Sequence, residues 1–179
     1  MKEMIEVLDD YGMLTGEILP RDVVHEKELL HRIVLVAIID SENRILLQHR
    51  ANTKKLYPNT WDISIAAHVL AGEESIETAL REANEEIGFQ VDRNVQVRNF
   101  RFVSSFRQDM HPDGRTERHW YDLFALIKEG DETNLRFNDS EVDGAKWCSY
   151  TDIQILKEKG ELFPRLGWIN PIFKRINRL

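Results

Sequence analysis

The stretch AHVLAGEESIETALREANEEIGF, residues 67–89, carries the most regular pattern in the chain. From Ile76 onward its apolar residues recur at intervals of three and four positions, which predicts a helix with one apolar face. Ser75 is a suitable residue to cap the start of this helix, and Gly88 suits the position just beyond its end. We therefore expect a helix over residues 75–87.

Three glutamates share another face of the expected helix. Glu82, Glu85 and Glu86 are spaced i, i+3 and i+4, so their carboxylates lie close together beside the apolar stripe. Like charges at this spacing destabilise an isolated helix, but they suit a hard divalent cation, because Mg²⁺ and Mn²⁺ prefer oxygen ligands. On spacing alone a solvated acidic face is the simpler interpretation, so the wider pattern has to decide.

The wider pattern resembles the Nudix box of the Nudix hydrolase family. That motif runs glycine, five residues, glutamate, seven residues, Arg-Glu, an apolar residue, any residue, Glu-Glu, any residue, glycine and an apolar residue. The matching positions are Glu73, Arg81, Glu82, Ala83, Glu85, Glu86, Gly88 and Phe89. The one departure is Ala67, which stands where the family usually has its first glycine.

The resemblance implies a fold of the α/β (α+β) class, a Nudix-like α/β/α sandwich around a mixed sheet. It also implies metal-dependent attack of water on a diphosphate, with Mg²⁺ or Mn²⁺ as the cofactor, because a bound cation neutralises the diphosphate and orients the water. Glu82, Glu85 and Glu86 are then the candidate catalytic residues and metal ligands. One of the three would double as the base.

The remaining motif positions are expected to be structural. Arg81 would hold Glu73 and orient the helix, and Gly88 would end it. The backbone carbonyl of Ala67 stays available as a ligand in spite of the missing glycine.

The segments around the motif predict a sheet with helices on both faces. We expect strands at residues 4–8 and 14–19, joined as a hairpin, then a polar connection over 21–31 and a second hairpin of strands 33–39 and 44–50. Further strands are expected at 62–69, 95–106, 119–127 and 145–150, and a helix at 151–160 capped by Thr151 or Asp152. The expected organisation is a hairpin extension (1–30), a Nudix domain (31–163) and a helical tail (164–179).

Composition narrows the class of protein. The chain has 179 residues and a formal net charge of −7, which argues against a nucleic-acid polymer or an anionic membrane as partner. Its one cysteine, Cys148, cannot form an internal disulfide, and its longest apolar run is too short to span a membrane. We expect a cytoplasmic protein that binds a small-molecule diphosphate, and the sequence leaves a homodimer open.

The flanks of the motif resemble one branch of the family, type I isopentenyl-diphosphate isomerase. His25, His31, His68 and Glu117 stand at places that match metal ligands of that enzyme. Singly, each histidine is more simply interpreted as an ordinary polar residue. Together the four form a candidate second metal site, because neutral imidazole suits Zn²⁺ or another transition metal.

The catalytic residues of the isomerase are not matched. Ala66 stands at the position of its cysteine, and His119 aligns with its essential glutamate. An alanine cannot donate or accept a proton, so we favour hydrolysis of a diphosphate linkage in a nucleoside diphosphate-type or related molecule. Isomerisation and a non-catalytic sensor module are the alternatives. Arg50 and Lys55 are candidate phosphate-binding residues, with solvated surface cations as the competing interpretation.

Overall fold

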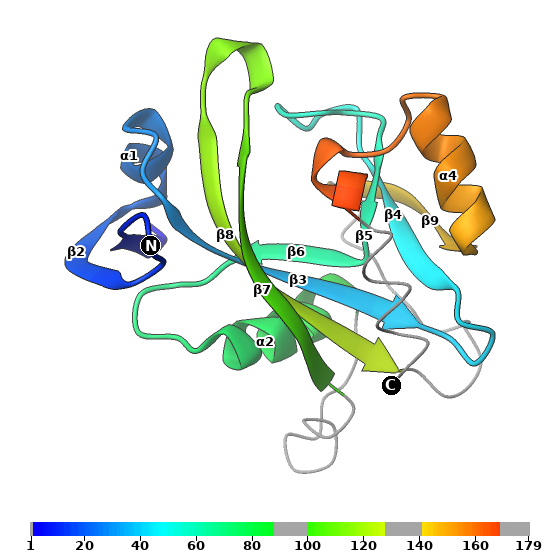
Figure 1. Cartoon of the computed structure of the whole chain (residues 1–179), viewed down its shortest axis with the longest axis horizontal. Coiled ribbons are helices and arrows are strands. Elements are labelled where there is room, and N and C mark those ends of the chain that lie inside the picture. Colours follow the sequence, from blue (N-terminus) through cyan, green and yellow to red (C-terminus); the bar gives the residue numbers. More distant parts are fainter. Residues whose placement is uncertain (1, 88–99, 128–140, 169–179) are drawn as a thin grey trace.

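The strand β3, His31–Ile39, lies at the centre of a mixed sheet formed by the nine strands that the structure describes. The computed structural model describes residues 2–87, 100–127 and 141–168. β3 runs parallel to β8 (Glu117–Ile127) and antiparallel to β6 (Ile65–His68). Because both neighbours come from distant parts of the sequence, the start of β3 is where separate segments meet (Figure 1).

The remaining strands extend the sheet on either side. β7 (Phe100–Met110) pairs with β8, and a short 3₁₀ turn, η2 (Pro112–Gly114), lies between them. On the other side, β4 (Ile45–Arg50) pairs with β5 (Trp61–Ile63) and β9 (Val142–Cys148). The expected strand at 145–150 is therefore found, and the part of the expected strand 95–106 before residue 100 lies outside the described residues.

Two expectations about strands need correction. The hairpin of 33–39 and 44–50 holds only at its tip, where Ile39 pairs with Ile45. The single strand expected at 62–69 is two strands, β5 and β6, which pair with β4 and β3 respectively. The buried Ser64 lies at the break, where its hydroxyl accepts a hydrogen bond from the Ile38 N–H and donates one to the Leu46 carbonyl.

Alternation along the central strands divides the core between two faces. One face of β3 and β8 packs with α4 (Tyr150–Glu158) and with η3 (Pro164–Trp168) through buried residues such as Ile153 and Leu166. The opposite face packs with α2 (Ser75–Ile87), through Ala79 and Ala83. The expected helix over 75–87 and the expected sandwich are both confirmed (Figure 1).

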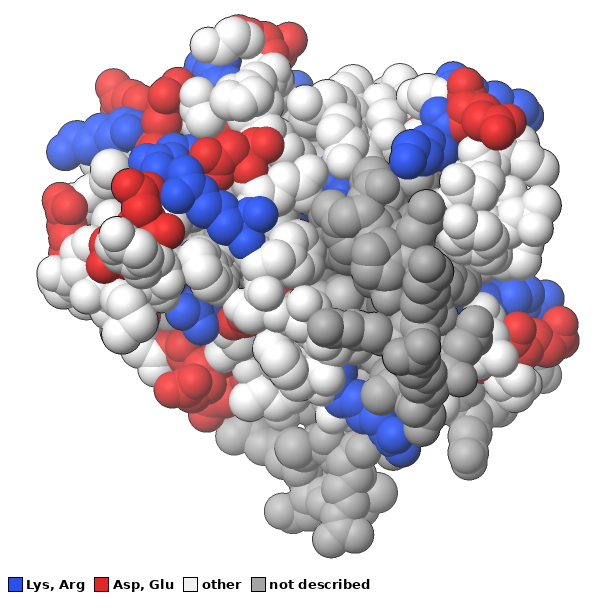
Figure 2. All heavy atoms as spheres, viewed as in Figure 1, with Lys and Arg blue, Asp and Glu red and all other residues white. Residues whose placement is uncertain are grey.

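The N-terminal hairpin has the expected strands, β1 (Met4–Leu8) and β2 (Leu14–Pro20). The connection expected over 21–31 is instead a short helix, α1 (Arg21–Glu26), which buries Val24 against β1. The turn of the hairpin lies against the β7–β8 pair, since Asp10 accepts hydrogen bonds from Arg107 and Arg118 at 2.8 and 2.6 Å. Acidic and basic side chains accordingly lie intermixed on that part of the face in Figure 2.

The C-terminal segment differs in detail from expectation. The cap of α4 is Ser149, whose hydroxyl accepts the Asp152 N–H, rather than Thr151 or Asp152. Of the expected tail helix, the structure describes only η3, and residues 169–179 lie outside the described residues. No helix in the described part of the chain is long and apolar enough to cross a membrane. The expected domain boundaries after residues 30 and 163 stay predictions.

Candidate functional site

The start of α2 is attached to the sheet by a buried carboxylate. Asp122 on β8 accepts a hydrogen bond from the Ser75 hydroxyl at 2.6 Å and forms an ion pair with Arg32 at 3.1 Å. Its other oxygen accepts the Ser105 hydroxyl at 2.6 Å. Since all three contacts converge on one buried group, they fix where the acidic face of α2 lies relative to the sheet.

Arg81 contacts three carboxylates of the motif. Its Nη2 and Nε atoms lie 3.1 and 3.2 Å from Glu73, as the resemblance implied. Its Nη1 lies 2.5 Å from Glu82 and 3.5 Å from Glu85. Burial favours a raised pKa for Glu73, but hydrogen bonds from Arg81 and Thr78 outweigh it and lower the pKa, so Glu73 stays ionised.

Glu82 is the half-buried member of the acidic face. Burial raises the pKa of this carboxyl, and the neighbouring Glu85 and Glu3 raise it further, whereas Arg81 acts in the opposite direction. A desolvated carboxylate beside other carboxylates is the kind of group that a divalent cation stabilises. The side chain of Glu86 and all of Gly88 lie outside the described residues.

A second group of ligand atoms gathers at the beginning of β3 and β8. It comprises His25 on α1, His31 on β3, His68 on β6, and Glu117 and His119 on β8. The ligand atoms of His25, His31 and His68 lie within 4.8 Å of one another, as do those of His25, Glu117 and His119. We call these five residues the histidine–glutamate cluster.

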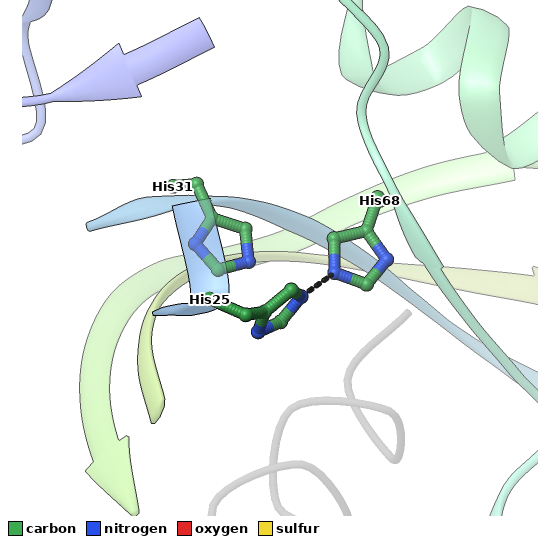
Figure 3. A group of neighbouring side chains, drawn as sticks. All are labelled: His25, His31 and His68. Carbon is green, nitrogen blue, oxygen red and sulfur yellow. Dashed lines mark hydrogen bonds between the residues drawn. The ribbon is translucent and has the colours of Figure 1, made fainter. Parts of the chain in front are cut away.

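Distances within the cluster are those of neighbouring metal ligands. The Nε2 atoms of His25 and His68 are 2.9 Å apart (Figure 3). Two nitrogens bound about 2 Å from one metal ion, at adjacent positions, are separated by about 3 Å. The Nδ1 atom of His25 also contacts Glu117 at 2.5 Å.

Protonation states in the cluster also suit a metal. The Nδ1–H of His31 donates to the Leu29 carbonyl at 2.9 Å, so its Nε2 carries a lone pair, and this buried atom has no partner among the described residues. Burial lowers the pKa of His31 to about 3 and lowers the pKa of His68 as well. Both imidazoles are therefore neutral at neutral pH, as a metal ligand must be.

Glu117 supplies the negative charge of the cluster. Burial favours a raised pKa, but contacts with His119 and His25 outweigh it and hold the pKa of Glu117 well below its usual range. In the sequence, His119 stands out only as the residue that replaces the essential glutamate of the isomerase. It is a further candidate ligand, because its Nε2 is buried and lacks a hydrogen-bond partner in the described part of the chain. Its Nδ1 lies 2.9 Å from the Tyr121 hydroxyl.

The two sites approach each other through the N-terminal segment. Arg21 forms an ion pair with Glu3 at 2.8 Å. After burial, Arg21 is the largest influence lowering the pKa of His68, and Glu3 contributes to raising the pKa of Glu82. This ion pair therefore lies within electrostatic range of both the cluster and the acidic face of α2.

The two candidate phosphate-binding residues differ in placement. Lys55 is exposed on the loop after β4. Arg50 is largely buried, and its Nε and Nη2 donate to the backbone carbonyls of Tyr57 and Leu56 at 3.2 and 2.7 Å. Arg50 therefore holds the loop, and less of its guanidinium is free for a ligand than the sequence suggested.

Two further residues bear on isomerase chemistry: Ala66 lies on β6, two positions before His68 of the cluster, and Cys148 lies on β9. Ala66 pairs with Leu35 inside the sheet and packs against the core face that carries α4. Cys148 is buried on β9, and burial raises the pKa of its thiol to about 11. Neither offers an acid or base beside the cluster.

The comparisons with known proteins agree with this architecture. The NUDIX domain matches residues 29–166, and the chain therefore belongs to the Nudix hydrolase family, whose members generally use divalent metal ions. The chain is 26% identical to an uncharacterised Nudix hydrolase of Listeria monocytogenes, over 96% of this chain and 94% of that protein. It is also 30% identical to an isopentenyl-diphosphate Δ-isomerase of Haloarcula marismortui, over 76% of this chain and 69% of that one.

Solved structures share the fold. A Deinococcus radiodurans protein superposes with a TM-score of 0.72 at 21% identity, covering 97% of this chain and 98% of that chain. The NUDIX domain of NrtR from Shewanella oneidensis, crystallised with ADP ribose, gives a TM-score of 0.59 at 13% identity and covers 81% and 87%. The chain is thus a Nudix-type hydrolase in fold and family.

Proposed function

We propose that the protein hydrolyses a diphosphate linkage in a nucleoside diphosphate-type or related small molecule, by attack of water at phosphorus. The observation that carries the proposal is the half-buried Glu82, which lies beside Glu85 on a helix that Asp122 fastens to the sheet. The family membership supports a hydrolase. The ligand of the NrtR domain, ADP ribose, contains a linkage of this kind.

Glu82, Glu85 and Glu86 would hold Mg²⁺ or Mn²⁺, which supplies charge neutralisation of the diphosphate and a polarised water. The residues fit such an ion, because Glu82 is desolvated beside another carboxylate. Arg81 positions Glu82 and Glu85 from one guanidinium and relieves their mutual repulsion. One of the three glutamates would accept the proton of the attacking water.

The histidine–glutamate cluster would hold a second metal ion. Four imidazoles with one carboxylate form a donor set that suits Zn²⁺, Mn²⁺ or another transition metal better than Mg²⁺. This site is supported by the buried Nε2 atoms of His31 and His119, neither of which has a hydrogen-bond partner among the described residues, and by the 3.6 Å approach of His119 Nε2 to Glu117. Since His25 comes from α1, the N-terminal segment would be part of the site.

A panel of diphosphates tests the proposed reaction. Nucleoside diphosphates and triphosphates, dinucleotides, sugar nucleotides and prenyl diphosphates are incubated with the protein and Mg²⁺ or Mn²⁺, and released phosphate, pyrophosphate or nucleotide is measured. On the substrate found, Glu82→Gln and Glu86→Gln should each lower turnover about 10²-fold or more, by extension of the 10–100-fold losses seen when the surroundings of a metal ligand are changed.

Glu74→Gln is the matched control, because Glu74 is an exposed glutamate just before the same helix. It should keep wild-type turnover. Unchanged turnover in Glu82→Gln would reject the assignment, and an intact fold with no reaction on any diphosphate would favour the sensor alternative.

A further inference from the structure

A buried group of charges on β4, β5 and η3 lies within electrostatic range of His119 in the histidine–glutamate cluster. Asp62 on β5 is fully buried, and its Oδ2 lies 3.2 Å from Arg165 on η3 and 3.6 Å from Arg50 on β4. Arg165 is itself buried, with 10% of its side chain exposed. Phe163 packs against both guanidinium groups, whose Cζ atoms lie 4.0 and 4.9 Å from the centre of its ring.

The hydrogen-bond donors of the two arginines are not equally used. Arg50 donates to two backbone carbonyls in addition to its contact with Asp62. The Nε of Arg165 is buried and has no hydrogen-bond acceptor in the described part of the chain. A guanidinium is always charged, and a buried N–H without an acceptor is unfavourable by about 1–3 kcal/mol. The unused donor therefore lies on Arg165.

Charge in this group is also unbalanced. Among the described residues, Asp62 is the carboxylate within 4 Å of both guanidinium groups, and one of its oxygens already accepts the Ile63 N–H at 2.8 Å. Arg50 also has Glu141 within electrostatic range, so the less compensated guanidinium is that of Arg165. Such an arrangement favours an additional anion, because a buried charge needs a partner. If Arg165 were only the counter-ion of Asp62, Arg50 would already serve that purpose.

Arg165 lies within range of the cluster. Burial raises the pKa of Tyr121 and lowers that of His119, and the charge of Arg165 opposes the first shift and adds to the second; the hydroxyl of Tyr121 contacts His119 at 2.9 Å. An anion on Arg165 would therefore lie beside the cluster. A guanidinium is suited to phosphate, since its planar donors match phosphate oxygens.

We propose that Arg165 binds a phosphate oxygen of the substrate, and that Asp62 and Phe163 hold its guanidinium in place for this purpose. This inference rests on the proposed function for its choice of ligand, a phosphoryl group. It assigns recognition of that group to Arg165 in preference to Arg50, whose donors are engaged, and Lys55, which is exposed.

The experiment measures anion binding separately from catalysis. Inorganic pyrophosphate is titrated by calorimetry, at low ionic strength, into the full chain freed of metal on a chelating resin. Arg165→Gln should weaken binding about 10- to 100-fold, the loss expected for a hydrogen bond to a charged group. Arg165→Lys keeps the charge but lacks the planar donors, so it should weaken binding by a smaller factor.

Lys159→Gln is the matched control and should change the dissociation constant by less than about 3-fold, because Lys159 is an exposed cation at the end of α4, outside this group. Thermal unfolding of Arg165→Lys and wild type shows whether a loss of binding in this variant comes from misfolding. Equal binding by wild type and both Arg165 variants, or no binding by wild type, would overturn the inference.

The outcome is independent of the reaction. Arg165-dependent pyrophosphate binding without hydrolysis of any diphosphate would reject the proposed function and keep this anion site. Hydrolysis with a wild-type KM in both Arg165 variants would keep the proposed function and reject the anion site at Arg165. Where a substrate is found, a raised KM with unchanged kcat in Arg165→Lys is the expected result.

Discussion

His25 Nδ1 lies 2.5 Å from the Oε2 atom of Glu117, although 92 positions separate the two residues in the sequence. His25 is on α1, before the residues that match the NUDIX domain, whereas Glu117 begins β8 inside that domain. The N-terminal segment therefore brings a ligand atom into the cluster.

This contact predicts that His25 strengthens metal binding. His25→Ala removes both a nitrogen ligand and the hydrogen bond that orients Glu117, so the affinity for Zn²⁺ or Mn²⁺ should fall at least about 10-fold. Calorimetric titration of the metal-free protein measures it. His111→Ala changes an exposed histidine beyond β7 and should leave the affinity unchanged. Equal affinities in the two variants would remove His25 from the site.

Arg81 is predicted to affect activity and stability together. Arg81→Ala leaves Glu73, Glu82 and Glu85 without their shared cation, so the carboxylates repel one another at the start and middle of α2. We expect lower turnover and a loss of about 1 kcal/mol in the free energy of unfolding, modest because the pairs are partly exposed. Turnover and thermal unfolding are measured on the same samples.

Arg115→Ala, an exposed arginine on the β7–β8 loop, is the control for that measurement. A loss of turnover with an unchanged melting curve would instead assign Arg81 a direct contact with the substrate.

Periodicity predicted the parts of the fold that are stabilised locally. The helix over 75–87 repeats its apolar positions for three turns, and the central strands form long apolar runs. The helix α1 was missed because it has six residues and buries only Val24, too little for a helical period to show. The break at Ser64 was missed because its cause is tertiary, a hydroxyl shared between two strands that the sequence does not place together.

The acidic face of α2 and the histidine–glutamate cluster also differ in how far the sequence alone predicts them. Glu82 and Glu85 lie on one helix, so spacing alone placed them together. The cluster draws on α1, β3, β6 and β8, and only the resemblance to a known family gathered its residues in advance. His119 could have been found from alternation, because residues 117 and 119 of a strand share a face. The expected strand began at residue 119, and that signal was lost.

Acid is predicted to destabilise the metal-free protein through the cluster. The pKa of His31 is about 3 in the folded chain, mainly because of burial, and about 6.5 in an unfolded chain. Below about pH 6.5 the unfolded chain therefore binds a proton that the folded chain does not. The stability is fully present above that pH and declines as the pH falls towards 3, by about 1.4 kcal/mol per unit for one such histidine.

Urea unfolding of the metal-free protein between pH 4.5 and 7.5 measures this dependence. His31→Gln should reduce the slope of the free energy of unfolding against pH by the contribution of about one proton. His111→Gln, which alters an exposed residue, should keep the wild-type slope. An identical slope in wild type and His31→Gln would show that His31 is not held neutral by its surroundings.

The protein is predicted to lack isopentenyl-diphosphate isomerase activity, despite its similarity to such enzymes. Moving a double bond requires one group that donates a proton to carbon and another that removes one. Ala66 has no such group; it is partly buried, paired with Leu35 and packed against the core. At the second position His119 is buried, and burial lowers its pKa, so it is a neutral imidazole held by Tyr121.

Restoring one group should not be enough. Ala66→Cys supplies a thiol, but His119 still stands where the isomerase has its glutamate, so the variant should form no dimethylallyl diphosphate from isopentenyl diphosphate. The combined variant Ala66→Cys, His119→Glu is the informative comparison, because it supplies both groups and keeps Glu117 in the cluster. Product is measured with metal present, and hydrolysis products are followed separately. Turnover by the wild-type protein above the metal-only blank would contradict the prediction and would assign the proton transfers to Glu117 or His119.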